Sequence, residues 1–263
     1  MLKRKTAISI ALLFVCISSG IAHEFWLITT KFMMEPNTQI TIQLKVGEGF
    51  VGEIWKGKIK NITFYENNKK KNLTIQDTVL QQIILDCKEV GTQLLVLESD
   101  FKKITLEAEQ FNAYLEEDGL NNVINHRKQN QEMTKSATEL YQRCAKMLLQ
   151  VGNVYTKQHA KKVGLPLEII LLQNPYDPNT KEVEAQLWFD NKILPNAMIK
   201  VWWHTKDDEI ASPQNLQTNA EGKIKIPIRK EGVYMISAVN MIKNQDGQSD
   251  WRSYWASYVF GFR

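Results

Sequence analysis

Residues 38–46, TQITIQLKV, place Ile40, Ile42, Leu44 and Val46 at every second position, with polar residues between them. This period of two predicts a β-strand that buries one face, because successive side chains point to opposite sides of a strand. The same period returns in three later segments, at residues 183–189, 199–203 and 224–228. The chain is therefore expected to be mainly β.

Around this first strand, residues 23–103 are expected to form an N-terminal β domain. The segments QQIILD (81–86) and TQLLVLES (92–99) flank CKEVG and predict a hairpin. Residues 165–263 contain about seven short segments of alternating character separated by turns. They predict a second sandwich-like domain, immunoglobulin-like but without the usual disulfide.

The pattern between the two β regions is different, and residues 104–160 are expected to be a helical segment. Residues 106–128 are rich in helix formers, with Phe111, Leu115 and Leu120 on one side and Gly119 at a helix end. In residues 136–153 the positions Leu140, Cys144, Met147 and Leu148 follow helical spacing. The predicted fold is thus two β-sandwich-like domains with a two-helix insertion between them.

Residues 1–22 have the features of a secretory signal peptide. Three basic residues, Lys3, Arg4 and Lys5, precede an apolar run at 7–15, and Gly20 and Ala22 are the small residues expected before a cut. A lipoprotein signal at Cys16 and an uncleaved anchor are the alternatives. Cleavage after Ala22 would export the chain to the periplasm or beyond it, with no transmembrane segment in the mature protein and His23 as its first residue.

Charge and cysteine content limit the classes of partner. The chain has 33 Lys and Arg residues against 29 Asp and Glu, and three of the basic residues leave with the signal. The nearly neutral remainder does not suggest binding to nucleic acid. Cys87 and Cys144 remain after cleavage, and they could form a disulfide in an oxidising compartment or stay as buried thiols.

Enzymatic function is not indicated, because the chain lacks the common nucleophile-elbow, zinc-protease, phosphate-loop and dinucleotide-binding motifs. The acidic residues between Glu107 and Asp118 are expected to form a solvated helix face. The tryptophans, concentrated at 202, 203, 251 and 255, are expected in the core and between domains rather than in a sugar-binding platform.

The strongest chemical candidate is His23. At a new N-terminus it would carry an α-amino group and an imidazole on one residue, and both can bind a divalent metal near neutral pH. Imidazole suits copper, nickel and zinc, and a further ligand would have to come from elsewhere. His23 could equally be only the first residue of a strand, since Phe25 and Leu27 alternate with Trp26.

Two other histidines, His126 and His204, are candidates for the further metal ligands. His126 lies at the end of a predicted helix, where a surface or capping role is the simpler interpretation. His204 is expected to face solvent together with Trp202 and Lys200, unless another domain covers that face of the strand.

Taken together, AHEFWL (22–27), LKVGEGFVGE (44–53), FNAYLEEDGL (111–120), GLPLEIILLQNPYD (164–177) and EGVYMISAVNM (231–241) resemble a widespread bacterial family of exported proteins of unknown function. Some members of that family are described as periplasmic components of nickel or cobalt uptake. The resemblance implies a sandwich-rich exported protein, with His23 as the family's leading histidine. Where the family often has a histidine in its C-terminal strand, this chain has Asn240, a poorer ligand for such metals.

The leading hypothesis is an exported, non-enzymatic binding protein that handles nickel, cobalt or copper through His23, with His126, His204 or a carboxylate cluster close to it, and delivers the metal to a membrane permease. One alternative is a structural or adhesion-type envelope protein that binds a protein or a glycan. A second alternative is a copper oxidase that uses His23 and a second histidine as a brace.

Overall fold

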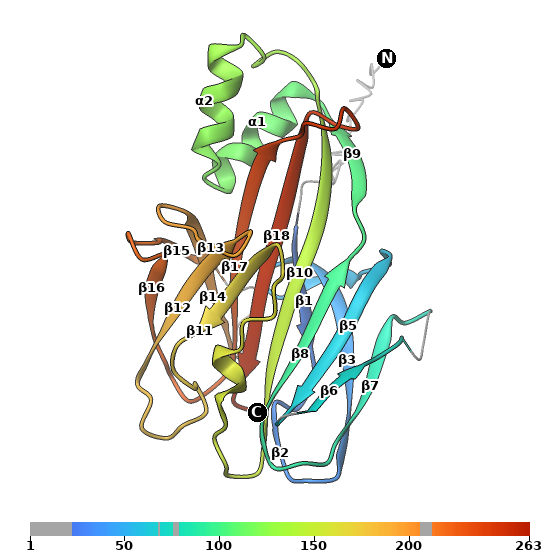
Figure 1. Ribbon diagram of the computed structural model, residues 1–263, viewed down its shortest axis with the longest axis vertical. Helices are drawn as coiled ribbons and strands as arrows, with labels where there is room; N and C mark the ends of the chain where they lie inside the picture. Colours follow the sequence, from blue (N-terminus) through green and yellow to red (C-terminus); the bar gives the residue numbers. More distant parts are fainter. Residues whose placement is uncertain (1–22, 68, 76–78, 206–211) are drawn as a thin grey trace, which may run out of the picture.

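The computed structural model describes residues 23–67, 69–75, 79–205 and 212–263 (Figure 1). The expected signal peptide, residues 1–22, lies outside this range. The protein is mainly β with a helical insertion, as the sequence predicts. Among the described residues, no helix is long and apolar enough to cross a membrane.

A long central sheet of ten strands organises the molecule, with β10 near its middle (Figure 1). Its main path runs β15 (Gln214–Gln217), β14 (Met198–His204), β17 (Val233–Lys243), β18 (Trp251–Gly261), β10 (Ala137–Val151), β8 (Gly91–Ser99), β5 (Ile59–Glu66) and β6 (Lys69–Asn72). Two further strands pair with β10, namely β2 (Met33–Met34) and β9 (Lys102–Leu106). The sheet therefore joins strands from both of the expected β domains.

A smaller four-stranded sheet covers each face of the central sheet. The first consists of β1 (Glu24–Ile28), β3 (Thr38–Glu48), β4 (Val51–Ile54) and β7 (Gln82–Cys87). The second consists of β11 (Leu167–Leu171), β12 (Glu182–Phe189), β13 (Lys192–Ile193) and β16 (Lys223–Pro227). A short 3-10 helix, η1 (Lys157–Ala160), precedes β11.

Two hydrophobic clusters fill the spaces between the layers. Ala145, Met147 and Leu149 of β10 pack with the first sheet, which contributes Ile42 and Leu44 from the predicted strand at 38–46. The alternate β10 side chains Cys144 and Leu148 instead pack with the second sheet. Side chains on the two faces of β10 thus contribute to two different hydrophobic cores.

The helices α1 (Ala108–Glu117) and α2 (Asn121–Gln129) lie at one end of the central sheet (Figure 1). They share a third cluster with Trp251 and Trp255 of β18, and both Phe111 and Leu115 of α1 are buried in it. Trp255 has the same alternation as Val259, which packs with the first sheet. The helices and the first sheet therefore cover the same face of the central sheet, one beyond the other.

Two local predictions are wrong. Residues 136–153 do not form a helix, since 137–151 form strand β10. Its helical spacing is a by-product of burial on both faces, which removes the polar alternation that usually marks a strand. The predicted hairpin of 81–86 with 92–99 is also absent, because β7 pairs with β3 and β8 pairs with β5 and β10. The chain changes sheets at this turn.

The two cysteines are buried free thiols. Cys87 packs between the first sheet and the central sheet, whereas Cys144 faces the opposite side of the central sheet. A disulfide between them is therefore excluded. Burial raises the pKa of both thiols to about 12, which makes them poor nucleophiles.

Candidate functional site

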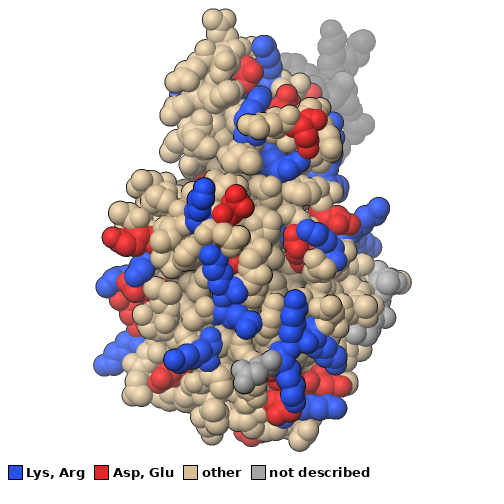
Figure 2. Space-filling model, in the orientation of Figure 1, with Lys and Arg blue, Asp and Glu red and all other residues tan. Residues whose placement is uncertain are grey.

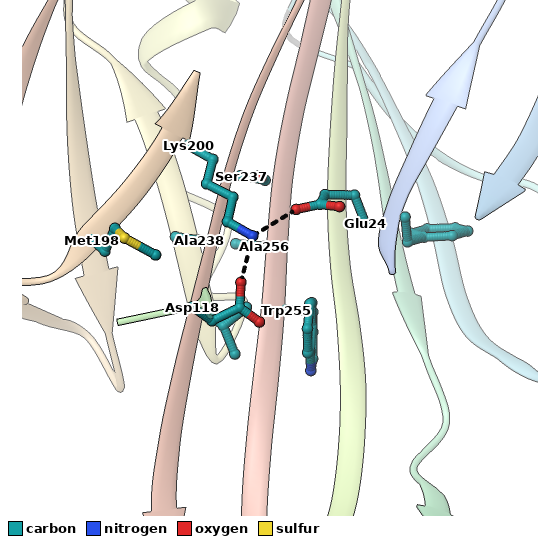
Figure 3. Close-up of a pocket in the computed structure, with 10 residues that line it drawn as sticks. Glu24, Asp118, Met198, Lys200, Ser237, Ala238, Trp255 and Ala256 are labelled. Atoms are coloured by element: carbon teal, nitrogen blue, oxygen red, sulfur yellow. Dashed lines mark hydrogen bonds and ion pairs between the residues drawn. The ribbon is translucent and has the colours of Figure 1, made fainter. Parts of the chain in front are cut away.

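The candidate site lies where the end of α1, the start of β1 and the middle of β14 meet over the central sheet (Figure 3). Lys200 of β14 points into this junction. Its ammonium lies 2.7 Å from Asp118, which follows α1, and 3.4 Å from Glu24, the first residue of β1. The side chains of all three are less than 10% exposed. The more exposed Glu117 is 3.6 Å from the same ammonium.

Burial determines the protonation of this cluster. It raises the pKa of Asp118 to about 7, although the nearby Lys200 ammonium acts in the opposite direction. Burial likewise raises the pKa of Glu24. For Lys200, burial acts to lower the pKa, but the carboxylates of Asp118 and Glu24 outweigh it and raise the value. The cluster thus holds one firmly charged ammonium among three carboxyl groups.

His23 is anchored to this junction by its backbone. Its carbonyl accepts a hydrogen bond from the guanidinium of buried Arg143 at 3.0 Å. That guanidinium lies 5.5 Å from the ring of Phe25, 5.3 Å from Tyr141 and 5.9 Å from Trp255. The His23 side chain itself is exposed. The first described residue is therefore fixed through its carbonyl and presents its imidazole to solvent.

A second buried carboxyl group, Glu139 of β10, lies beneath α1. It accepts hydrogen bonds from Ser253 and, at 3.2 Å, from the hydroxyl of Tyr114. Ser253 in turn accepts one at 3.1 Å from the indole of Trp255. Burial raises the pKa of Glu139 to about 7, even though these donors act to lower it. The other carboxyl oxygen has no partner among the described residues.

The cavity at the junction is small. Its volume is about 10 Å³, which is room for roughly one water molecule. Glu24, Asp118 and Lys200 line it together with Ala238 and Val239 of β17. Asn240, which stands where the resembling family has a histidine, is not among its lining residues. The cluster is a buried support for the start of β1 rather than a substrate pocket.

The three histidines predicted as metal ligands are spread along the central sheet. The ring of His126 lies 5.2 Å from that of Trp251, the first residue of β18. His204 pairs with Val233, which pairs with Gly261, the last residue of β18. At about 3.3 Å per residue, the length of β18 separates these histidines by roughly 30 Å.

His23 lies level with the middle of β18. Its carbonyl is bound by Arg143 of β10, and Arg143 pairs with Trp255 in the middle of β18. Within the described part of the chain, no three His, Cys, Asp or Glu side chains form a group that could hold a metal ion. The structure thus leaves His23 without His126 or His204 as a nearby ligand.

His204 does not face open solvent, contrary to the simplest expectation from the sequence. Its ring lies 5.5 Å from that of Phe50, which follows β3 in the covering sheet. The same sheet buries Trp202, and Lys200 is buried at the junction with the helices. Trp251 and Trp255 are buried as well, in agreement with the expected core role of the tryptophans.

Sequence reasoning missed Glu24, Asp118, Arg143 and Lys200. Asp118 was counted among the acids of a solvated helix face, and Lys200 was expected to face solvent. One signal was present, since Lys200 alternates with Trp202 and therefore shares the face of a large apolar residue.

Comparisons with known proteins give a family but no function. A family model described as "Domain of unknown function (DUF4198)" matches residues 21–242. A comparison with curated proteins found no match. Among solved structures, that of Salmonella alpha-2-macroglobulin reacted with methylamine aligns at 6% identity and a TM-score of 0.25. That alignment covers 90% of this chain and 15% of the other.

Proposed function

The chain belongs to this family of unknown function, and we propose that it is an exported, non-enzymatic binding protein for a divalent transition metal. His23 is the anchor of the site, after cleavage behind Ala22. Nickel, cobalt and copper are the candidate ions, and a membrane permease is the partner that would receive them in the periplasm.

The observation that supports this proposal is the way His23 is held. Arg143 fixes its carbonyl at 3.0 Å while the side chain remains exposed. A chain that began at this residue would therefore present its amino group and imidazole from a fixed point. Ordering a ligand before binding reduces the entropy lost on binding, which favours affinity.

Local charge supports a cation at the same place. Glu24 follows His23 directly in the chain, and Glu117, Asp118 and Lys200 lie beside Glu24. The carboxyl groups in this set outnumber the ammonium. The Arg143 guanidinium adds a second positive charge beside His23, so the exposed Glu117 carboxylate is the group in this set most available to attract a bound cation.

The other two functions receive less support. A copper oxidase needs a second histidine beside His23, and neither His126 nor His204 lies there. The binding of a glycan by an aromatic platform would need exposed tryptophans, whereas Trp202, Trp251 and Trp255 are buried.

The test is a metal titration of protein that begins exactly at residue 23. Nickel, cobalt, copper and zinc should bind to this protein at least about tenfold more tightly than to a control with one alanine added before His23. The added residue removes the chelating amine and keeps the imidazole. His23→Ala should abolish the tight site in protein with the correct terminus. Equal affinity for the His23 terminus and the extended control would refute the proposal.

A further inference from the structure

We propose that a groove between the β4–β5 connection and the start of β9 binds a small organic anion, one that carries two or more negative charges on a flat apolar frame. This site is separate from the metal proposed at His23 and does not depend on it. We call it the lysine groove, and residues 55–58, residues 99–103 and Tyr141 line it.

The size of the groove fits a small molecule. Its volume is about 400 Å³, within the range of about 300–1,000 Å³ that is typical of ligand pockets. One wall is the connection between β4 and β5, and the other runs from the end of β8 into β9. This volume far exceeds that of the cavity at Lys200, which admits no more than a water-sized molecule.

The charge of the groove favours an anion. Lys56, Lys58, Lys102 and Lys103 line it, and Asp100 is the only acidic residue in the lining. All four lysines are exposed, and none of them forms an ion pair with another described residue. Lys103 donates to the carbonyl of Gln248 at 2.5 Å. Ammonium groups without a carboxylate partner are available to the carboxylates or phosphates of a ligand.

Three aromatic side chains line the same groove, namely Trp55, Phe101 and Tyr141. Trp55 is buried to 8% exposure and lies 4.9 Å from the ring of Phe25. Phe101 is 41% exposed, with the Arg252 guanidinium 5.0 Å and the Tyr254 ring 5.8 Å from its ring. An aromatic or otherwise planar ligand can pack against the exposed parts of these rings while its acidic groups reach the lysines.

The walls of the groove are fixed by backbone contacts. The amide of Asp100 donates to the carbonyl of Lys58 at 3.0 Å, which joins the two walls. At residue 57 a Cβ atom would lie only 2.0 Å from the ring of Trp55. Gly57 therefore allows the indole to lie across the backbone, and any larger residue would displace it. The groove is a formed site rather than a chance gap between mobile lysines.

The test measures anion binding by calorimetry on the full mature chain. Benzene-1,3,5-tricarboxylate is the flat probe, tricarballylate is the flexible tricarboxylate, and inorganic phosphate is the small anion. We expect the flat probe to bind most tightly, and binding to weaken as salt is added. Failure of the flat probe to bind, or binding no tighter than that of tricarballylate or phosphate, would overturn the proposal.

A charge-matched pair of variants locates the site. Lys56→Gln/Lys58→Gln/Lys102→Gln should weaken binding of the flat probe at least about tenfold. The control Lys31→Gln/Lys128→Gln/Lys192→Gln removes three exposed positive charges elsewhere and should change it less than about twofold. Equal losses in the two variants would show a general charge effect and reject the lysine groove.

Gly57→Ala tests the aromatic wall. Because this change displaces Trp55, it should weaken binding of the flat probe while leaving phosphate binding unchanged. Circular dichroism and the thermal midpoint of each variant confirm that the fold is intact. An unchanged affinity for the flat probe in well-folded Gly57→Ala protein would contradict the proposed packing on Trp55.

Discussion

Individual charged residues are buried deep inside this molecule, and each is held by a different set of partners. Lys146 and Glu168 are both 1% exposed and lie 2.6 Å apart across the second core. Lys146 also donates to the carbonyls of Lys161 and Ile169 at 3.1 and 3.0 Å. Glu168 accepts three backbone N–H bonds, from residues 163, 164 and 165. Glu168 therefore accepts hydrogen bonds from three backbone amides in addition to forming its ion pair with Lys146.

We expect Lys146→Met to lower the free energy of unfolding by about 3–5 kcal/mol, because it leaves a buried carboxylate without its counter-charge. Glu168→Leu should lower it further, since three amide donors lose their acceptor as well. Urea denaturation measures both. The double variant should lose less than the sum of the two single losses. A smaller loss for Glu168→Leu than for Lys146→Met would contradict this account.

Glu139 should give stability a pH dependence. Its folded pKa of about 7 lies above the ordinary 4.5, so the folded state binds the proton more tightly than the unfolded chain. The stabilisation is therefore complete below about pH 4.5, declines as the pH rises toward 7, and is lost above that. Each unit by which the folded pKa exceeds the unfolded pKa contributes roughly 1.4 kcal/mol to the free energy of unfolding.

Glu139→Gln should flatten this slope, because an amide stays neutral. Asp118, whose pKa is also about 7, would continue to contribute, so the slope should fall without vanishing. Urea denaturation between about pH 4.5 and 8 measures the change. Glu35→Gln, at an exposed position, is the control and should leave the slope unaltered. An unchanged slope in Glu139→Gln would rule out Glu139 as its source.

The sequence could not predict these buried charges. It correctly indicated which side chains of β14 alternate, with Val201 on one face and Lys200 on the other. It could not indicate that α1 and β1, distant along the chain, would bury Lys200. Glu24 and Asp118 are similar, since their burial depends on packing between elements and not on local spacing.

At the scale of elements, β10 shows how burial changes the pattern of a strand. Residues 142–151 are all buried, including Gln142, Arg143, Lys146 and Gln150. With both faces covered, apolar residues no longer alternate with polar ones, and the remaining spacing can also fit a helix. The helices at 108–129, in contrast, were predictable because one face stays in solvent and Gly119 marks the end of α1.

Gly119 separates α1 from α2, and its substitution tests how tightly the helices sit on the sheet. Its φ is +64°, and a Cβ atom would lie 3.1 Å from that of Met198. We expect Gly119→Ala to cost about 1–2 kcal/mol for the left-handed backbone, plus the displacement of Met198. Gly164→Ala is the matched control, since φ is +84° there and nothing lies within 4 Å.

Denaturation of the two glycine variants gives the comparison. A greater loss of unfolding free energy for Gly119→Ala would measure the contact between the helical insertion and β14. Equal losses would indicate that the helix connection adapts without strain at Met198.

At the scale of the whole molecule, the central sheet is built from segments that the sequence divides between two domains. Strands β5, β6 and β8 come from residues 59–99, whereas β14, β15, β17 and β18 come from the C-terminal part. β10 lies between them and pairs with both β8 and β18. Local periodicity identifies strands and turns, but it does not show which strands pair with each other across the boundary between the two expected domains.

This pairing predicts one cooperative unit. We expect unfolding of the mature chain in urea to give coincident transitions by tryptophan fluorescence and far-ultraviolet circular dichroism. The isolated segment 165–263 should not fold, because it lacks β10 and the first sheet. Its β18 would have an unpaired edge, and Trp202, Met235 and Val259, now buried against the first sheet, would be exposed. Two separate transitions, or a cooperatively folded segment 165–263, would instead establish independent domains joined by a sheet that contributes little to their stability.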